Sequence, residues 1–310
     1  MSVYHGHSGL PDDARGAVAA LGNFDGVHRG HAAVIAEARA LAAELGARPA
    51  AAVFSPHPRM LFQPGAEPFA LMSEAQRVRA LNAEGVEIVH HIAFDRALAG
   101  MTPGAFVKEV LADGLGLRGV VTGADFCFGK DRAGNAAALK TLGAAHGIKA
   151  RVAGAVKAEG ADGKISSSDV RNALRQGDPQ RAAILLGRPF AIEGVVQTGD
   201  RRGRTIGFPT ANVPLGDYVR PAFGVYAARS RLPGGALIAG VANLGRRPTV
   251  EGTEARLEVH LFDFDADLYG QTIETELVSF IRPEQKFDGL DALKAQIFAD
   301  AGTARRLLNV

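Results

Sequence analysis

Residues 17–31 of the chain read A-V-A-A-L-G-N-F-D-G-V-H-R-G-H. The first five are an apolar run of strand length, Gly22 and Gly26 follow in a turn, and a helical pattern of apolar residues starts at about residue 30. A strand that passes through a glycine-rich turn into a helix is the first half of a βαβ unit. This stretch therefore predicts an α/β fold with a parallel sheet.

The same alternation continues to about residue 183. Short apolar runs predict strands at 16–22, 49–55, 86–92, 118–123 and 148–155, and helical patterns lie near 30–45, 73–83, 103–113, 134–146 and 168–176. Alternation at this spacing indicates a parallel sheet with helices on both faces, whose ligands bind at the carboxyl ends of the strands.

After Leu186 the pattern changes to β-prone runs separated by Gly, Pro and Asp, near 189–198, 210–213, 223–231, 237–244, 256–262 and 272–281. They predict a six-stranded antiparallel β-barrel. Apolar positions at helical spacing predict a C-terminal helix that packs on it through Phe287, Leu290, Leu293, Ile297 and Phe298. The expected domains are 1–185 and 186–310, so the fold class is α/β plus β.

Composition narrows the class of protein. The chain has 310 residues, of which 47% are hydrophobic and 22% charged, as in an ordinary globular protein of two domains. No apolar run is long enough to span a bilayer, no signal peptide is recognisable, and Cys127 is the single cysteine, so we expect a cytoplasmic protein without disulfides. The net charge of +2 gives no support for a nucleic-acid partner.

His28 and His31 lie where the first strand turns into the first helix. Glycines let the backbone approach a ligand there, and a helix N-terminus attracts phosphate, so two histidines three residues apart can neutralise charge that develops on a phosphoryl group. The pair could instead ligate zinc, or be polar surface residues of an ordinary turn.

A second glycine- and arginine-rich stretch spans residues 194–212 and ends in G-F-P-T-A-N. It lacks the G-K-[ST] of a Walker loop, but its glycines and arginines can surround a polyphosphate, and oxygen atoms of Thr210 and Asn212 suit Mg²⁺. The arginines alone are also compatible with a flexible basic hairpin.

These motifs resemble those of bacterial bifunctional riboflavin kinase/FAD synthetases, whose N-terminal part is a nucleotidyltransferase. The resemblance in the first half rests on G-N-F-D-G-V-H-R-G-H (22–31), F-S-P-H-P-R (54–59), G-A-D-F-C-F-G (123–129) and I-S-S-S-D-V-R (165–171). In the second half it rests on G-F-P-T-A-N (207–212), N-L-G-R-R-P-T (243–249), residues 258–270 and R-P-E-Q-K-F (282–287).

The resemblance implies a Rossmann-like FMN adenylyltransferase domain and a riboflavin kinase barrel. It implies ATP-dependent phosphorylation of riboflavin to FMN and adenylylation of FMN to FAD, with Mg²⁺, and with small molecules as the partners of a monomer or weak homo-oligomer. Two alternatives stay open at this point. One is a riboflavin kinase with a degenerate or differently specific N-terminal domain, and the other is a flavin- or nucleotide-binding protein without turnover.

The resemblance also implies roles for individual residues. The catalytic residues are His28, His31 and Glu258, of which Glu258 is the kinase base. Nucleotide and phosphate are bound by Gly22, Asn23, Phe24, Asp25, Gly26, Gly30, Ser167, Ser168, Arg171, Gly199, Arg201, Gly203, Arg204, Gly207 and Pro209. Flavin is bound by His57, Pro58, Asp125, Phe126, Phe128 and Arg282, and metal by Thr210 and Asn212. Ser167 or Ser168 is expected to cap the helix that follows.

Overall fold

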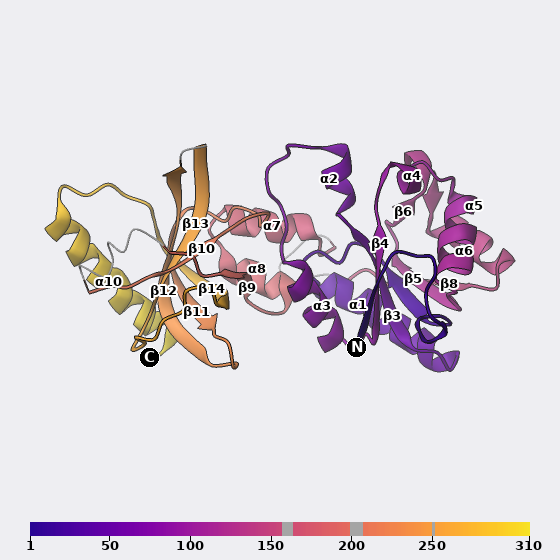
Figure 1. Ribbon diagram of the computed structural model, residues 1–310, viewed down its shortest axis with the longest axis horizontal. Coiled ribbons are helices and arrows are strands. Elements are labelled where there is room, and N and C mark those ends of the chain that lie inside the picture. Colours follow the sequence, from indigo (N-terminus) through magenta and orange to yellow (C-terminus); the bar gives the residue numbers. More distant parts are fainter. Residues whose placement is uncertain (157–163, 199–206, 250–251) are drawn as a thin grey trace. The chain divides into compact units, whose positions relative to one another are not determined.

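The computed structural model describes residues 1–156, 164–198, 207–249 and 252–310. The chain forms two compact units (Figure 1). The first comprises Met1–Ala66 and Glu74–Ile165, and the second comprises Glu67–Ser73 and Ser166–Val310. This division assigns the helices that follow residue 166 to the second unit, whereas the predicted domain boundary lies at residue 185. The boundary at residue 185 stays a prediction about which residues serve which reaction.

The first unit alternates strands and helices as predicted. Its strands are β1 (Ser2–His5), β2 (Val18–Leu21), β3 (Pro49–Ser55), β4 (Ile88–Ala93), β5 (Gly119–Gly123), β6 (Cys127–Phe128), β7 (Gly134–Asn135) and β8 (Lys149–Ala153). Its helices are η1 (Asp12–Ala14), α1 (Arg29–Glu44), α2 (Pro58–Phe62), α3 (Glu74–Ala83), α4 (Arg96–Ala99), α5 (Pro103–Ala105), the π-helix η2 (Phe106–Gly114), η3 (Lys130–Arg132) and α6 (Ala136–Ala145).

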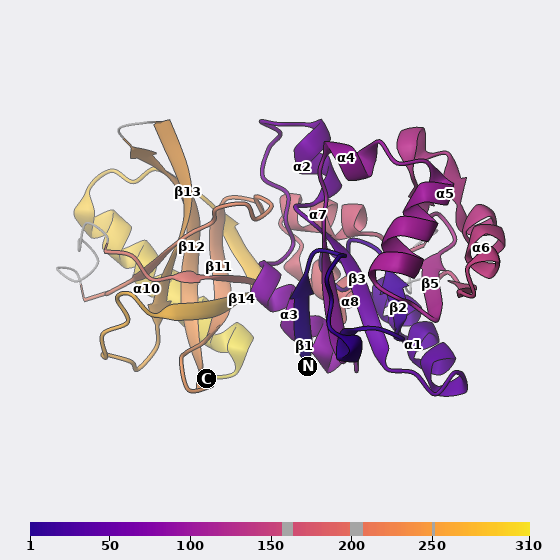
Figure 2. The same ribbon diagram turned by 45° about the vertical axis from the view of Figure 1, so that its right-hand side comes forward.

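Six of these strands form a parallel sheet in the order β1-β4-β3-β2-β5-β8. Figure 2 labels four of them, β1, β3, β2 and β5. The chain moves from β2 to β3 in one direction and returns past β2 to reach β5. Because such crossovers are right-handed, α1 and η2 cover opposite faces, and the sheet has a topological switch point between β2 and β5. Ligands of open α/β sheets bind at the carboxyl ends of the strands at such a point.

The core of this unit contains many small side chains. On one face of the sheet, Ala19, Leu21 and Ala52 are at most 2% exposed and belong to one cluster with Phe106 and Leu111 of η2. Alternation along a strand points every second side chain to the same face, which accounts for this apolar layer. The layer holds the carboxyl ends of β2 and β3 in fixed positions under the loops that follow them.

The second unit is a barrel with helices. Its elements are α7 (Ser167–Arg175), α8 (Pro179–Leu186), β9 (Phe190–Val195), β10 (Ala211–Pro214), β11 (Gly224–Arg231), β12 (Leu237–Thr249), β13 (Gly252–Leu261), β14 (Thr272–Pro283) and α10 (Leu290–Leu308). The strands pair in the order β10-β13-β12-β11-β14-β9, each pair antiparallel. An antiparallel bridge between Gln197 and Asn212 connects the two outer segments, so the barrel is almost closed, as predicted.

The C-terminal helix α10 packs on the barrel through a different set of residues than predicted. Its buried side chains include Ala301, Ala304 and Leu308, whereas Leu290 is 56% exposed and Phe298 61% exposed. Small side chains let the helix approach the strands closely. Of the predicted residues, Leu293 and Ile297 are half-buried, and the Phe298 ring packs against Phe208 at 4.8 Å.

Two further local predictions need correction. The short strand β1 was not predicted, and it lies at the edge of the sheet beside β4. The helix α7 is capped by Ser166 instead of Ser167 or Ser168: the Ser166 Oγ accepts a hydrogen bond from the Asp169 N–H at 3.3 Å, and the Asp169 carboxylate accepts one from the Ser166 N–H at 3.0 Å. This reciprocal capping box requires the acidic residue three positions after the cap, which only Ser166 has.

Candidate functional site

The histidine segment follows β2 at the switch point of the sheet. His28 has an extended backbone and is the N-cap of α1, and its Nδ1 accepts a hydrogen bond from the backbone N–H of His31 at 3.2 Å. The turn before it includes Phe24 and Val27 at positive φ, 50° and 36°. The loop thus delivers His28 to the N-terminus of a 16-residue helix, where a phosphate group is favoured.

The two imidazole rings are stacked, with centroids 3.6 Å apart and planes 15° apart. The Phe24 ring packs edge-on against His31 at 5.1 Å, and Phe24 itself is 1% exposed. His28 is 4% exposed and His31 is half-buried. The pair is therefore held by packing on one side and by the helix cap on the other, and its predicted role toward phosphate stays a prediction.

Gly30 is required by this arrangement. A Cβ atom at position 30 would lie 3.1 Å from the His28 ring and 3.1 Å from the backbone oxygen of Ile165. Both neighbours are fixed, one by its cap and the other by backbone, so a side chain here would displace the histidine. Gly26, with a φ of 90°, supplies the left-handed turn just before it.

Arg77 of α3 also contacts this loop, although it belongs to none of the motifs found in the sequence. Its Nη1 donates to the backbone oxygen of Asn23 at 3.4 Å. Burial lowers the pKa of Arg77, and the nearby carboxylates of Glu74 and Asp25 oppose that shift. Asp25 is 7% exposed. A guanidinium thus lies beside the loop that carries the histidines, a source of positive charge that only the packing of α3 reveals.

The segment after β5 lies across the switch point from the histidine loop. The carboxylate of Asp125 forms an ion pair with Lys164, and the hydrogen bond from this ammonium lowers the pKa of Asp125. The next aromatic side chains are stacked: the rings of Phe126 and Phe128 lie 5.8 Å apart with planes at 18°. Phe128 is 6% exposed within the core, so its contacts support the loop, and its binding of flavin stays a prediction.

His57 and Pro58 begin the short helix α2 after β3. His57 is the N-cap, and its Nδ1 accepts the Arg59 N–H at 3.1 Å, while Pro58 occupies the first helical position. Both residues therefore follow a carboxyl end of the same parallel sheet, two strands from β5. Their binding of flavin stays a prediction.

Ser167, Ser168 and Arg171 lie on α7, in the second unit. Arg171 donates from Nε to the backbone oxygen of Phe69 at 2.7 Å and lies over the Phe69 ring at 5.3 Å. Ser168 is exposed and Ser167 is half-buried at the first turn of the helix. The phosphate role of the three residues stays a prediction.

In the barrel, three strands place polar side chains in one row. Glu258 of β13 is directly paired with Asn212 of β10 on one side and with Asn243 of β12 on the other. Residues paired in this way point to the same face of a sheet. On that face, Val241 of β12 packs against α10 together with Ala304. The carboxylate, two amides and the α10 helix therefore share one side of the barrel.

The G-F-P-T-A-N segment runs into this row. Gly207 has a φ of 82°, the ring of Phe208 packs against His260 at 4.7 Å, and His260 Nδ1 donates to the backbone oxygen of Pro209 at 2.9 Å. The Asn212 amide donates to the backbone oxygen of Thr210 at 3.2 Å, and Asn212 is 6% exposed. The remaining predicted phosphate residues, Gly199, Arg201, Gly203 and Arg204, lie outside the described residues.

Arg282, predicted to bind flavin, is engaged within the fold. Its Nε and Nη2 donate to the carboxylate of Asp300 on α10 at 3.0 and 2.7 Å, and its guanidinium lies 5.6 Å from the centre of the Phe287 ring. Asp300 is 4% exposed, so this pair fixes α10 to β14. Any contact with flavin is additional to that role.

Two family models match successive parts of the chain. A family model described as FAD synthetase matches residues 10–169, and one described as riboflavin kinase matches residues 186–308. A bifunctional riboflavin kinase/FMN adenylyltransferase of Pseudomonas fluorescens is 42% identical over 99% of this chain and 98% of its own length. The proteins of the same description from Escherichia coli K12 and Bacillus subtilis are 40% and 38% identical, over 99% of this chain and 96% and 97% of their own lengths.

A solved structure is similar over nearly the whole chain. The crystal structure of a Streptococcus pneumoniae protein described as a macrolide-efflux protein superposes with a TM-score of 0.86 at 32% identity, covering 98% of this chain and 99% of that chain. Within the part of the chain that the structure describes, none of the helices is both long and apolar enough to cross a bilayer. On the family models and the full-length relatives together, the chain belongs to the bifunctional riboflavin kinase/FMN adenylyltransferase family.

Proposed function

We propose that the chain makes FAD in two consecutive reactions, each assigned to its own set of residues. The barrel transfers the γ-phosphate of ATP to the 5′-hydroxyl of riboflavin and releases FMN and ADP. The α/β part joins FMN to the AMP moiety of a second ATP and releases pyrophosphate. The two family models support the assignment of one reaction to each part of the chain. The proposed functional division falls near residue 185, with 1–185 as adenylyltransferase and 186–310 as kinase.

In the adenylyltransferase reaction a phosphate oxygen of FMN attacks the α-phosphorus of ATP, and the bond from this phosphorus to the pyrophosphate oxygen breaks. No covalent enzyme intermediate is needed, so catalysis depends on position and charge. Because the His28 Nδ1 accepts the His31 N–H, the ring proton of neutral His28 lies on Nε2. That N–H is the donor that stabilises the charge developing on the α-phosphate, at the positive end of α1.

His31 acts beside His28 from the first turn of the same helix. Its stacked position, 3.6 Å from the His28 ring, directs both imidazoles toward the same volume. Ser167, Ser168 and Arg171 would bind the remaining phosphate oxygens through hydroxyl and guanidinium groups, and Asp125, Phe126 and the His57–Pro58 turn would contact flavin.

In the kinase reaction Glu258 accepts the proton of the riboflavin 5′-hydroxyl as the new O–P bond forms. The observation that carries this proposal is the direct pairing of Glu258 with Asn212, next to the segment that contains Thr210. An acceptor for the proton and oxygen ligands for a metal are thus adjacent.

The residues fit Mg²⁺ as the ion that accompanies ATP. The donors in this row are amide, hydroxyl and carboxylate oxygens, which suit a hard cation, and the Asn212 amide nitrogen is already used by the Thr210 backbone, which leaves the amide oxygen for a ligand. When bound, the ion would neutralise charge on the β- and γ-phosphates. Thr210 and Asn212 would hold it.

A product assay tests the whole proposal. Purified chain with riboflavin, ATP and Mg²⁺ is expected to accumulate FAD, separated from FMN and riboflavin by chromatography. Accumulation of FMN alone would refute the adenylyltransferase assignment, and tight riboflavin binding without ATP consumption would refute both reactions. We further propose a cytoplasmic monomer or weak homo-oligomer, supported by the single cysteine and checked by light scattering over a concentration series.

A further inference from the structure

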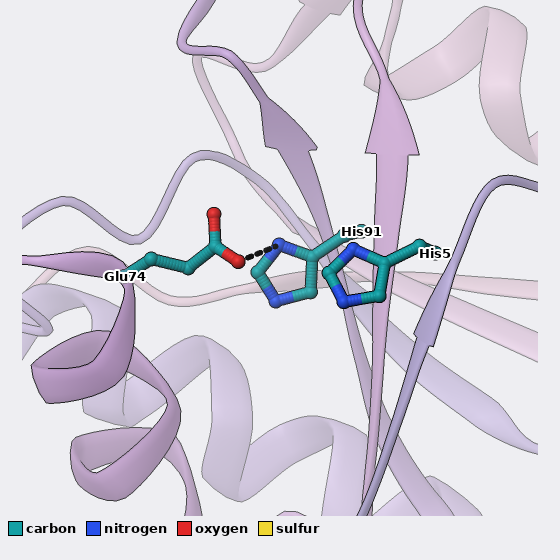
Figure 3. A group of neighbouring side chains, drawn as sticks. All are labelled: His5, Glu74 and His91. Atoms are coloured by element: carbon teal, nitrogen blue, oxygen red, sulfur yellow. Dashed lines mark ion pairs between the residues drawn. The ribbon is translucent and has the colours of Figure 1, made fainter.

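A second group of chemically active side chains lies at the edge of the parallel sheet that β1 and β4 form. His5 ends β1, His91 lies in β4 and Glu74 begins α3 (Figure 3). One ligand atom from each residue, a ring nitrogen or a carboxylate oxygen, lies within 4.8 Å of the others. Neither proposed reaction uses these residues.

The topology explains why residues so far apart in sequence meet. β1 and β4 are parallel neighbours in which His5 is paired with His91, and their rings lie 5.0 Å apart with planes at 30°. Figure 3 shows the Glu74 carboxylate reaching the His91 ring from α3, and Glu74 Oε1 lies 3.5 Å from His91 Nδ1. Two adjacent strands and one helix start thus supply two nitrogens and one oxygen.

A purely structural role does not explain this group, because of the surroundings of His91. The residue is 2% exposed, and among the described residues neither of its ring nitrogens has a hydrogen-bond partner. The one polar contact of the ring in this part of the chain is the 3.5 Å approach of Glu74. A buried imidazole without hydrogen bonds is costly, and buried polar groups without partners are rare in native proteins. A metal ion between His91 and Glu74 would satisfy that nitrogen.

Glu74 is oriented by its own neighbours. Its Oε2 accepts a hydrogen bond from Ser55 Oγ at 3.2 Å and lies 3.9 Å from Arg77 Nη2, so Oε1 is the oxygen directed at His91. Ligands of metal sites are commonly held by such outer partners. The Arg77 charge is engaged by the other carboxylate oxygen and by the Asn23 backbone.

We propose that His5, Glu74 and His91 bind a divalent transition-metal ion of the Zn²⁺ type. Two ligands about 2.1 Å from a tetrahedral ion lie about 3.4 Å apart, close to the observed 3.5 Å between His91 Nδ1 and Glu74 Oε1. His5 is exposed, so a change of its side-chain torsions brings its nitrogen into range without moving the sheet. Water fills the fourth position on the exposed side. Imidazole and carboxylate together favour zinc over magnesium or calcium.

Metal binding by the full-length chain tests the proposal. Protein stripped with a chelator is titrated with Zn²⁺ by calorimetry, and Co²⁺ is added separately to record the absorption bands of a tetrahedral ion. We expect one equivalent to bind, and His5→Ala and Glu74→Gln each to weaken binding by more than about tenfold. Both side chains are exposed, so these variants are expected to fold.

Two further variants distinguish this site from other histidines. His146→Ala removes an exposed histidine of the same unit and is expected to leave zinc binding unchanged. The double variant His28→Ala/His31→Ala is also expected to keep it, since the proposed ligands remain. Absence of binding, loss of binding in the His28/His31 variant, or full binding in both His5→Ala and Glu74→Gln would overturn the proposal.

Discussion

The Nδ1 atom of His28 accepts the backbone N–H of His31, 3.2 Å away, so one imidazole caps α1 with one nitrogen, while the other nitrogen is the one to which we assign the contact with phosphate. The two uses are separable by substitution, because an asparagine oxygen can replace Nδ1 as a cap and has no donor where Nε2 lies.

His28→Asn is therefore expected to keep the stability of the chain and to lose adenylyltransferase activity. Removal of one preorganised donor costs about 10²- to 10³-fold in rate. His28→Ala should lose the same activity and, in addition, about 1 kcal/mol of stability with the cap. Both activities are measured on each variant, FMN to FAD and riboflavin to FMN, with thermal unfolding alongside. Equal loss of the kinase activity in His28→Asn would contradict the assignment.

Gly30→Ala should lower FMN adenylylation by about tenfold or more while riboflavin phosphorylation continues, since a Cβ here lies 3.1 Å from the His28 ring and must displace it. The matched control is Gly104→Ala in α5, where a Cβ has no neighbour within 4 Å. Steady-state rates of both reactions distinguish the two variants. Normal adenylylation by Gly30→Ala would show that the observed ring position is not the catalytic one.

Glu258→Gln is expected to reduce riboflavin phosphorylation by about 10²- to 10⁴-fold, because the amide cannot accept the hydroxyl proton. Adenylylation of added FMN should be unchanged. Glu276→Gln serves as control, since it removes another strand glutamate of the barrel, one whose pKa is raised by burial. A kinase activity that survives Glu258→Gln would assign proton removal to another group.

Arg282 and Asp300 offer a test of fold against flavin contact. Arg282→Met leaves a carboxylate that is 4% exposed without its guanidinium, at a cost of about 3–5 kcal/mol, whereas the double variant Arg282→Met/Asp300→Leu should recover much of that stability. If Arg282 also contacts flavin, the double variant will keep a raised KM for riboflavin. A normal KM in the stable double variant would confine Arg282 to the fold.

The stability of the chain should fall in mild acid because of His90. This residue is 0% exposed, and burial, with a smaller contribution from His91, lowers its pKa from 6.5 to about 4. Below pH 6.5 the unfolded chain binds a proton at His90, whereas the folded chain does not bind it until about pH 4. The free energy of unfolding is therefore unaffected above pH 6.5 and decreases between about pH 6.5 and pH 4, by about 3 kcal/mol in total. Unfolding by urea across this range, with chelator present, measures it. His90→Leu should flatten the profile, and an unchanged slope in that variant would assign it elsewhere.

Much of the fold follows from local sequence. The five predicted strands of the parallel sheet and the six of the barrel are all present, because each is an apolar run bounded by glycine, proline or aspartate. β1 was missed because Ser2–His5 is short, lies at an edge and alternates between half-buried and exposed residues. The prediction of which α10 side chains are buried was wrong for residues such as Leu290, because large apolar residues are the stronger signal in a sequence, whereas close packing selects alanines such as Ala304.

The site was predictable only where its residues are neighbours in the chain. His28, His31 and Gly30 belong to one continuous motif, and the structure brings them together. The row formed by Asn212, Glu258 and Asn243 depends on the register of three strands, which no local pattern encodes. The approach of Arg77 to Asn23, and of His91 to Glu74, likewise depends on how α3 packs against the sheet.

The cap formed by His28, together with the catalytic role proposed for it, has a consequence for how this enzyme can change over evolutionary time. A descendant whose α/β part no longer makes FAD would still unfold more easily if position 28 became apolar, because α1 would lose its cap. Selection for folding alone would therefore accept asparagine, serine or aspartate there. Such a polar residue in place of the histidine would identify a domain that has lost adenylyltransferase activity but is still selected to fold. It would distinguish that domain from one that is losing its fold as well.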